Sequence, residues 1–229
     1  YLFNKKAKSF EKIVQQDGSI LYKFQFKNYY SLIDQENKET RVYKNKIKRL
    51  INNKLSDING NPAIEDKNKT VHIIDGKKHR DVGFAYSDSK YIKFYFKGLK
   101  HRIDGPAVIE NENSSGRHYL FGFYYREDDY KKAVNELSNL DLKIYSDRIV
   151  FRSKTTNKIH RDYGPAIIYF DKSYKFFKDG KLHNDTGFAY NINKSRDCYV
   201  NGIKKEKNNF VFLSKTEKMI SYRRNGKFH

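Results

Sequence analysis

The segment "GLKHRIDGPAVI" (Gly98–Ile109) occurs again, little changed, as "NKIHRDYGPAII" (Asn157–Ile168). Two looser copies, "GKKHRDVGFAYS" and "GKLHNDTGFAYN", begin at Gly76 and Gly180, and a degenerate copy, "KLSDINGNPAIE", spans Lys54–Glu65. Copies that follow one another directly are 22 or 23 residues apart. A short fixed period is the signature of a repeat architecture. The segment from the histidine to the alanine, which we call the box, therefore decides the fold.

Several residue types occupy fixed positions in the box. All three prolines of the chain share one position, and the next position is alanine in five copies. Chance does not concentrate three prolines in this way. The residues that we interpret as structural parts of the repeat are His79, His101, His160, His183, Gly83, Gly105, Gly164, Gly187, Pro62, Pro106 and Pro165.

A short aromatic or β-branched run precedes the box, as in "KFYF" (Lys93–Phe96) and "YKFF" (Tyr174–Phe177). A dipeptide such as Asp-Gly, Asn-Gly or Lys-Gly follows the run, and the first two are strong hairpin signals because a type I′ turn needs positive φ. The box proline suits a second turn or a strand start, since it has a fixed φ and no N–H. The chain is therefore predicted to be mainly β, an elongated antiparallel meander of hairpin repeats of about 22 residues with two or three short helices.

This unit resembles the MORN repeat, a β-hairpin of similar length with aromatic runs and glycine turns. The "HRxDGPA" form looks like MORN-like repeats of phage, giant-virus and bacterial proteins. The resemblance covers roughly 54–109 and 150–229, although MORN repeats carry more glycine and a tryptophan, which this chain lacks. It implies a scaffold for protein interaction or membrane association, which is an analogy of fold and not a derivation of function. A viral or phage structural or accessory role is the corresponding expectation.

The regular spacing is interrupted between His101 and His160, which are 59 residues apart. Here "REDDYKKAVNELSNLDL" has acidic residues at a possible helix start, with Asp128 or Asp129 as the cap, and apolar residues at helical spacing. A second, basic helix is predicted at residues 40–53, and a weaker third at "SFEKIVQQ". The expected division is a degenerate or helical cap at 1–53, hairpin repeats at 54–109, a helical insertion at 110–149 and hairpin repeats at 150–229. Both chain ends fall inside a repeat, which suggests a piece of a longer polypeptide.

The formal net charge is +20, from 47 basic and 27 acidic side chains. Such an excess favours an acidic partner, although abundant lysine, asparagine, isoleucine and tyrosine are also what an AT-rich genome encodes. Both explanations stay open. Cys198 is the single cysteine, which excludes an intrachain disulfide and fits a reducing compartment. No long apolar run or secretory signal is visible, so we expect an intracellular or virion-associated protein.

The box histidines and the aspartates near them invite a metal or catalytic interpretation. Equivalent residues of consecutive hairpins are roughly 10 Å apart, however, because neighbouring strands are about 4.8 Å apart. Zinc needs ligand atoms about 2 Å from the metal. We therefore expect each histidine to hydrogen-bond a turn carbonyl or the box aspartate. The arginine that follows it is expected to pair with an acid or stack on a ring. We predict no enzyme activity, no cofactor and no metal, since no nucleophile–base pattern or phosphate-binding glycine loop is present.

Three function hypotheses follow. The first is a non-enzymatic scaffold that binds a partner protein through an exposed aromatic face. The second is nucleic-acid binding, in which lysine and arginine neutralise phosphates beside stacking rings. The third is binding of an anionic membrane surface through the helix at residues 40–53. Candidate anion contacts are Lys93, Lys97, Lys100, Arg102, Lys175, Lys178, Lys46, Lys48 and Arg49. One continuous stripe formed by the first six would favour nucleic acid over a protein partner.

Overall fold

The computed structural model describes residues 7–110, 116–193 and 195–205, and the backbone of 211–212, 222–224 and 227–228. The chain divides into two compact units, Tyr1–Tyr124 and Tyr125–His229, here called unit 1 and unit 2. Each unit is described by itself. The chain is mainly β, and its largest sheet is an antiparallel meander, as the sequence predicts.

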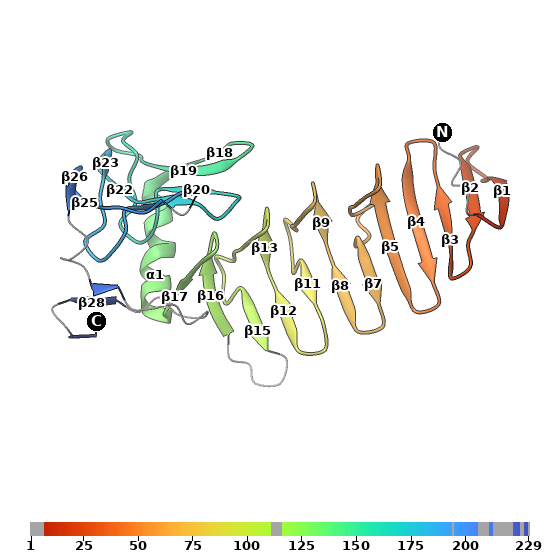
Figure 1. Ribbon diagram of the computed structural model, residues 1–229, viewed down its shortest axis with the longest axis horizontal. Helices are drawn as coiled ribbons and strands as arrows, with labels where there is room; N and C mark the ends of the chain where they lie inside the picture. Colours follow the sequence, from red (N-terminus) through yellow and green to blue (C-terminus); the bar gives the residue numbers. More distant parts are fainter. Residues whose placement is uncertain are drawn as a thin grey trace. The chain divides into compact units, whose positions relative to one another are not determined.

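The first five strands of unit 1 have five or six residues each and follow one another as hairpins, and the two-residue strand β6 pairs with the fifth (Figure 1). They are β1 (Ser9–Val14), β2 (Ile20–Gln25), β3 (Tyr29–Ile33), β4 (Lys38–Tyr43), β5 (Lys46–Ile51) and β6 (Lys54–Leu55). The predicted helices at residues 40–53 and at "SFEKIVQQ" were therefore wrong. A two-residue turn after Tyr43 splits the expected helix, and Val42 then pairs with Ile47 across the hairpin. Alternating β-branched residues satisfy a period of two as well as they satisfy a helical period.

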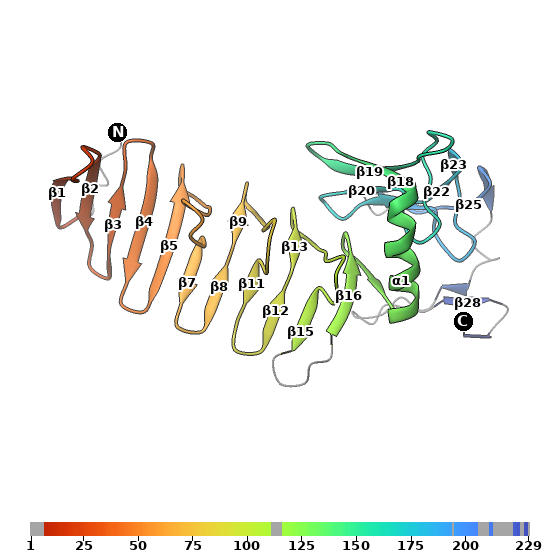
Figure 2. The same ribbon diagram turned by 180° about the vertical axis from the view of Figure 1, so that it is seen from behind.

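The repeats continue this sheet with shorter strands in chain order, and the same row is seen from behind in Figure 2. The strands are β7 (Ile64–Asp66), β8 (Lys69–Val71), β11 (Tyr86–Ser87), β12 (Tyr91–Lys93), β15 (Val108–Glu110), β16 (Gly116–Leu120) and β17 (Phe123–Tyr125). The described residues of unit 1 contain no helix. Both faces of this sheet therefore present side chains that no helix of the same unit covers.

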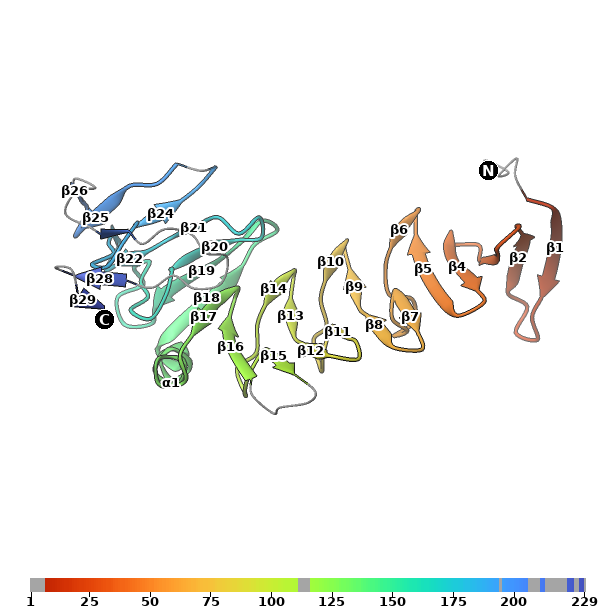
Figure 3. The same ribbon diagram turned by 60° about the horizontal axis from the view of Figure 1, so that its bottom comes forward.

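Each repeat adds a small hairpin beyond the main sheet, as Figure 3 shows for β9 (Ile73–Ile74) with β10 (Lys77–Lys78) and β13 (Tyr95–Phe96) with β14 (Leu99–Lys100). In the second turn, Lys97 has a φ of 45° and Gly98 has a φ of 87°. Two successive residues with positive φ are the mark of the expected type I′ turn.

The sequence analysis missed one further turn of this kind. Phe121 has a φ of 49° and Gly122 has a φ of 92°, so they form the corresponding pair between β16 and β17. An aromatic residue in the first turn position gives no hairpin signal, and no box follows it. The array therefore extends into the segment that we expected to be a helical insertion.

The box alanines form the most deeply buried positions of the array. All five are 0% exposed: Ala63, Ala85, Ala107, Ala166 and Ala189. Each carbonyl accepts a backbone N–H from the strand that precedes the box, as in Phe94 N–H to Ala107 O at 2.9 Å. A larger side chain has no free volume there, which explains why every copy has alanine.

Unit 2 begins with α1 (Glu127–Glu136) and the 3₁₀ turn η1 (Leu137–Asn139). The predicted helix is confirmed, and it buries Tyr130 and Ala133. Its N-cap is Arg126 rather than an aspartate, while Asp128 and Asp129 lie in the first turn, where they favour the helix dipole. This is the single α-helix among the described residues, where two or three short helices were expected.

The rest of unit 2 is a second set of hairpins. One sheet contains β18 (Leu140–Ile144), β19 (Arg148–Ser153), β20 (Ile167–Tyr169), β21 (Tyr174–Lys175) and β24 (Tyr190–Asn191). Small hairpins follow the box pattern: β22 (Phe177–Lys178) with β23 (Lys181–Leu182), and β25 (Cys198–Val200) with β26 (Ile203–Lys205). Three short strands, β27 (Val211–Phe212), β28 (Tyr222–Arg224) and β29 (Lys227–Phe228), pair with one another. The division into four segments remains a prediction.

We predict that Ala107→Leu destabilises the protein. The three added carbon atoms have no space, and overpacking of a tight site costs about 1–3 kcal/mol. Val82→Ala is the control, because Val82 is 83% exposed and its truncation should change the free energy of unfolding by less than about 0.5 kcal/mol. Urea unfolding measures both variants, and an unchanged midpoint for Ala107→Leu would contradict the packing described above.

Candidate functional site

The four described box histidines share one interaction across the repeat boundary. The Nδ1 atom accepts a hydrogen bond from the backbone N–H of the first turn residue in the next hairpin. The pairs are Lys97 N–H to His79 at 3.3 Å, Phe121 to His101 at 3.3 Å, Asp179 to His160 at 3.2 Å and Asn201 to His183 at 3.1 Å. His229, which we placed in the same series, lies outside the described residues. Each histidine thus connects its own repeat to the next one.

This interaction favours one tautomer of a neutral ring in His79, His101 and His183, whereas Nδ1 of His160 also faces the Asp179 carboxylate at 3.1 Å. Because Nδ1 accepts in the first three rings, their proton resides on Nε2. In three of the boxes Nε2 faces the aspartate two residues later. The N···O distances are 3.2 Å for His79 and Asp81, 3.4 Å for His160 and Asp162, and 3.2 Å for His183 and Asp185. The aspartate contact agrees with the sequence-based expectation. The turn contributes an amide donor to the ring, however, and not the expected carbonyl acceptor.

The residue after the histidine closes the box turn. Its side-chain nitrogen donates to the carbonyl four residues later, in Arg80 to Phe84, Arg102 to Pro106, Arg161 to Pro165 and Asn184 to Phe188, at 3.0–3.5 Å. The guanidinium of Arg102 also lies 4.1 Å from the centroid of the Phe94 ring and pairs with Asp104 at 2.7 Å. These contacts support a structural role for the box arginine.

The box glycine is needed for its backbone conformation. At Gly105 the backbone φ is 151°, whereas an added Cβ would make only an ordinary van der Waals contact, at 3.6 Å, with the Arg102 guanidinium. Gly164 has a φ of 141°, and there the added Cβ would collide with the hydroxyl of Tyr125. Glycine is the residue that accepts this backbone conformation and this close approach together.

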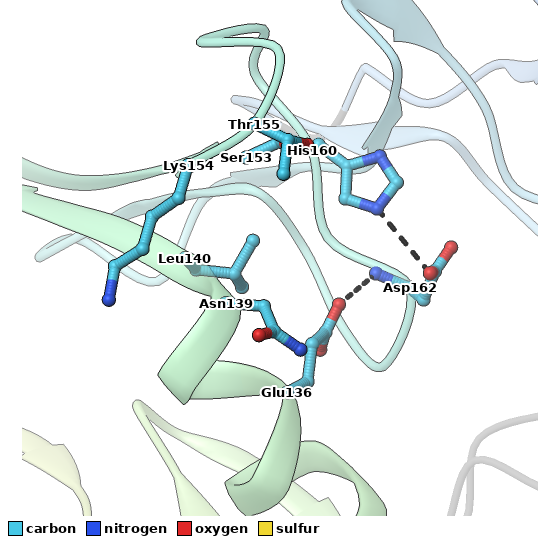
Figure 4. Close-up of a pocket in the computed structure, with 8 residues that line it drawn as sticks. All are labelled: Glu136, Asn139, Leu140, Ser153, Lys154, Thr155, His160 and Asp162. Carbon is cyan, nitrogen blue, oxygen red and sulfur yellow. Dashed lines mark hydrogen bonds and ion pairs between the residues drawn. The ribbon is translucent and has the colours of Figure 1, made fainter.

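Unit 2 contains a small hollow of about 340 Å³ beside Glu136, His160 and Asp162 (Figure 4). One ligand atom from each of these three residues lies within 4.8 Å of the others, so the group has the composition of a metal site. The sequence analysis missed Glu136, which comes from the last turn of α1. Helical spacing alone does not reveal which box a helix residue approaches.

The bonding of these residues argues against metal ligation. His160 has a carboxylate beside each ring nitrogen, Asp162 at 3.4 Å from Nε2 and Asp179 at 3.1 Å from Nδ1. The two carboxylate oxygens of Glu136 accept the N–H groups of Asp162 and Tyr163, at 2.5 and 3.2 Å. The His160–Asp162 pair also repeats an arrangement found in other boxes. Glu136 therefore holds the box loop against the end of α1.

Arg161 makes a second contact between the box loop and the end of α1. Its side chain is fully buried, lies 4.4 Å from the Phe151 ring centroid and approaches the Glu136 carboxylate at 3.8 Å. A buried charge needs such partners, because desolvation without them is costly. Burial raises the pKa of the neighbouring Tyr125 hydroxyl, which donates to the Tyr163 carbonyl at 2.7 Å. This group of residues is a structural junction.

A set of basic side chains, mostly lysines, lies over tyrosine rings in unit 1. Three lysines lie over the Tyr86 ring, with the ammonium nitrogens of Lys69, Lys78 and Lys93 at 5.5, 4.8 and 4.7 Å from the ring centroid. Tyr91 has Lys93 at 4.4 Å and Arg117 at 5.9 Å from its centroid. Three further pairs are Lys48 with Tyr43 at 5.6 Å, Lys78 with Tyr95 at 5.3 Å and Lys100 with Tyr119 at 4.6 Å. We call these eleven side chains the lysine–tyrosine face.

The strand register places the strand members of this set on one side of the sheet. Directly opposed residues share a face, and so do residues two apart. One row runs through Lys48, Ile64, Val71, Tyr86, Lys93, Val108 and Arg117. Lys78 and Lys100 reach their rings from the small hairpins, in the repeat position just before the histidine. That shared position is visible in the sequence, but we did not use it.

The predicted anion contacts fall into three groups. Lys48, Lys93 and Lys100 belong to the lysine–tyrosine face, and Lys46 lies two residues from Lys48 on the same strand. Arg49 and Arg102 are engaged in box-turn contacts with Pro62 and Pro106, and Lys97 is a turn residue. Lys175 and Lys178 belong to unit 2, so a stripe common to all six remains a prediction. Lys69, Lys78 and Arg117 were missed.

No family model matches the chain, and no curated protein and no solved structure is significantly similar to it. The resemblance to MORN repeats therefore stays a prediction. Within the described residues, no helix is long and apolar enough to cross a membrane.

We predict that Arg102→Gln lowers stability and leaves anion binding intact. The variant loses the stacking on Phe94 and the bond to the Pro106 carbonyl, which together contribute about 1–2 kcal/mol. Arg126→Gln is the control, because the exposed Arg126 side chain makes no cap hydrogen bond. Thermal unfolding and a salt titration of oligonucleotide binding measure the two effects. A reduced salt slope with unchanged stability would instead assign Arg102 to a phosphate contact.

Proposed function

We propose that the chain is a non-enzymatic repeat scaffold that binds nucleic acid along the lysine–tyrosine face of unit 1. The observation that carries the proposal is the repeated placement of ammonium groups over tyrosine rings on one side of an antiparallel sheet. A row of positive charge follows a phosphate backbone, and rings between the charges give bases a surface for stacking.

The repeat divides its residues between two tasks. The box histidine, arginine and glycine are used in bonds within and between repeats, as His79, Arg80 and Gly83 illustrate. The lysines and tyrosines lie outside the box, at positions where the repeat motif does not specify the residue type. A scaffold that keeps its joining residues separate from its surface residues can present a ligand surface without loss of the fold.

Acidic residues also lie on this face: in the strand register Asp66 is opposite Lys46 and Lys69, and Glu110 is opposite Tyr91. Glu110 pairs with Arg117 at 3.5 Å, and Asp88 accepts the hydroxyl proton of Tyr86. Among the described residues, Lys48, Lys69, Lys78 and Lys93 form no ion pair with a carboxylate. The charge of these lysines is therefore available to an anionic ligand.

A partner protein was our first hypothesis from the sequence, on the assumption of an exposed apolar aromatic face. The ammonium groups over the rings make this face basic, which supports nucleic acid as the first candidate. One observation still favours a protein ligand: the box loops of unit 1 expose apolar side chains, with Val82 at 83% and Ile103 at 56%. A protein that binds the loop tips is the second candidate.

The membrane hypothesis loses its physical basis. It depended on an amphipathic helix at residues 40–53, and these residues belong to β4, β5 and the turns beside them. A hairpin presents its apolar residues on one face of a larger sheet and cannot lie in a membrane surface as a separate helix.

We predict that Lys48→Gln/Lys100→Gln weakens the binding of a single-stranded oligonucleotide. Each lost phosphate contact should lower the slope of log K against log salt concentration by roughly 0.7, so the double variant should lose about 1.4. Lys27→Gln/Lys54→Gln is the matched control, because both lysines are exposed and lie outside the lysine–tyrosine face. Fluorescence anisotropy at several salt concentrations provides the slopes.

Two results of this titration would contradict the proposal. One is the absence of binding by the unmodified protein at physiological salt. The other is an equal loss in the control variant, which would show that net charge and not the face governs binding. A poly-glutamate peptide serves as a second ligand, and tighter binding of the peptide would assign the face to an acidic protein.

A further inference from the structure

Three lysines of the face converge on a single ring. Tyr86 lies on β11, between β8, which carries Lys69, and β12, which carries Lys93. Lys78 comes from the small hairpin strand β10. The three ammonium nitrogens lie 5.5, 4.7 and 4.8 Å from the centroid of the Tyr86 ring, in that order. The ring thus places three positive charges in one small volume.

Two carboxylates near this cluster offset part of its charge. Asp66 is opposite Lys69 in the strand register, and the pKa of Asp88 is lowered by the Tyr86 hydroxyl and, to a smaller extent, by the charge of Lys93. Within the described part of the chain, none of the three lysines forms an ion pair with a carboxylate. Asp88 accepts hydrogen bonds from the Tyr86 hydroxyl and from the amides of Lys90 and Tyr91, the last two at 2.9 and 2.6 Å, and it keeps its negative charge. The hydrogen bond from the hydroxyl, with burial, raises the pKa of Tyr86 to about 12, so the phenol stays neutral at physiological pH and adds no negative charge.

Keeping three like charges together has an energetic cost. Burial lowers the pKa of Lys78, and the charges of Lys93 and Lys69 lower it further. A structural explanation is that lysine stems cover the ring, and this explains one or two of them. It does not explain why a third ammonium from a separate hairpin reaches the same ring. An anion bound among them would remove the repulsion.

We propose that Lys69, Lys78 and Lys93, with the Tyr86 ring as their base, form a binding site for a multiply charged phosphate ligand. Lysine is a point charge with three donors on a flexible stem, so the site fits phosphate oxygens without demanding one planar geometry. The chemistry is shared by a free polyphosphate and by adjacent phosphates of a nucleic-acid strand. Binding of a nucleic-acid strand at this site rests on the proposed function, in which the site holds the nucleic acid on the lysine–tyrosine face.

Lysine footprinting tests the site residue by residue. The whole protein is treated with a limiting amount of an amine-acetylating reagent, alone or with inorganic tripolyphosphate, a single-stranded oligonucleotide or a poly-glutamate peptide, and mass spectrometry measures the acetylation of each lysine. We expect tripolyphosphate to slow the acetylation of Lys69, Lys78 and Lys93 at least threefold. The exposed Lys27 and Lys54 should react at unchanged rates.

A matched pair of variants gives the second readout. Lys69→Gln/Lys93→Gln should weaken tripolyphosphate binding at least tenfold in calorimetry, whereas Lys27→Gln/Lys54→Gln should leave it unchanged. Circular dichroism checks that both variants fold. Because each pair removes the same number of charges, a loss confined to the first pair reflects the cluster and not net charge.

The outcomes separate this inference from the proposed function. Uniform protection of all lysines, or none at the cluster, overturns the site. Protection by poly-glutamate equal to that by tripolyphosphate also overturns it, because the site would then not distinguish phosphate from carboxylate. If the oligonucleotide binds through Lys48 and Lys100 and leaves the cluster unprotected, the proposed function stands and the site fails. If tripolyphosphate protects the cluster and no oligonucleotide binds, the site stands and the proposed function fails.

Discussion

The structure depends on a hydrogen bond between successive repeats, from a turn amide of one hairpin to the box histidine of the repeat before it. A short hairpin is only marginally stable alone in water, so each repeat needs its neighbour. The turn glycine strengthens the link, since its N–H donates to the carbonyl just before the same histidine, as in Gly98 to Lys78 at 2.8 Å. Side chain and backbone together thus hold one tip against the next.

This link explains why the chemically active residue types of the box are poor candidates for chemistry. A histidine whose Nδ1 accepts an amide, and whose Nε2 faces an aspartate, has no free lone pair for a metal. The box arginine is bound to a backbone carbonyl and packed on glycine or a phenyl ring. The lysines over tyrosine rings have no such task, and they give unit 1 its candidate binding surface.

The sequence predicts those parts of the fold that a single residue type enforces. Glycine after a turn residue, the box proline and the fully buried alanine identified the hairpins, and helical spacing around Tyr130 identified α1. Residues 40–53 were misassigned because a turn within them is not marked by glycine or proline. Of the candidate site, Lys48, Lys93 and Lys100 were foreseen. The convergence on Tyr86 was not, since it depends on a cross-strand register and on a hairpin that approaches from outside the sheet.

The most direct test of the central claim is the tautomer of the box histidines, measured by long-range ¹H–¹⁵N correlation spectra at a mildly alkaline pH, where an imidazole is ordinarily neutral. The account predicts the Nε2–H tautomer for His79, His101 and His183, with an unprotonated Nδ1 that accepts the turn amide. A protonated Nδ1 in these rings would contradict the account, because the link between repeats would then have no acceptor.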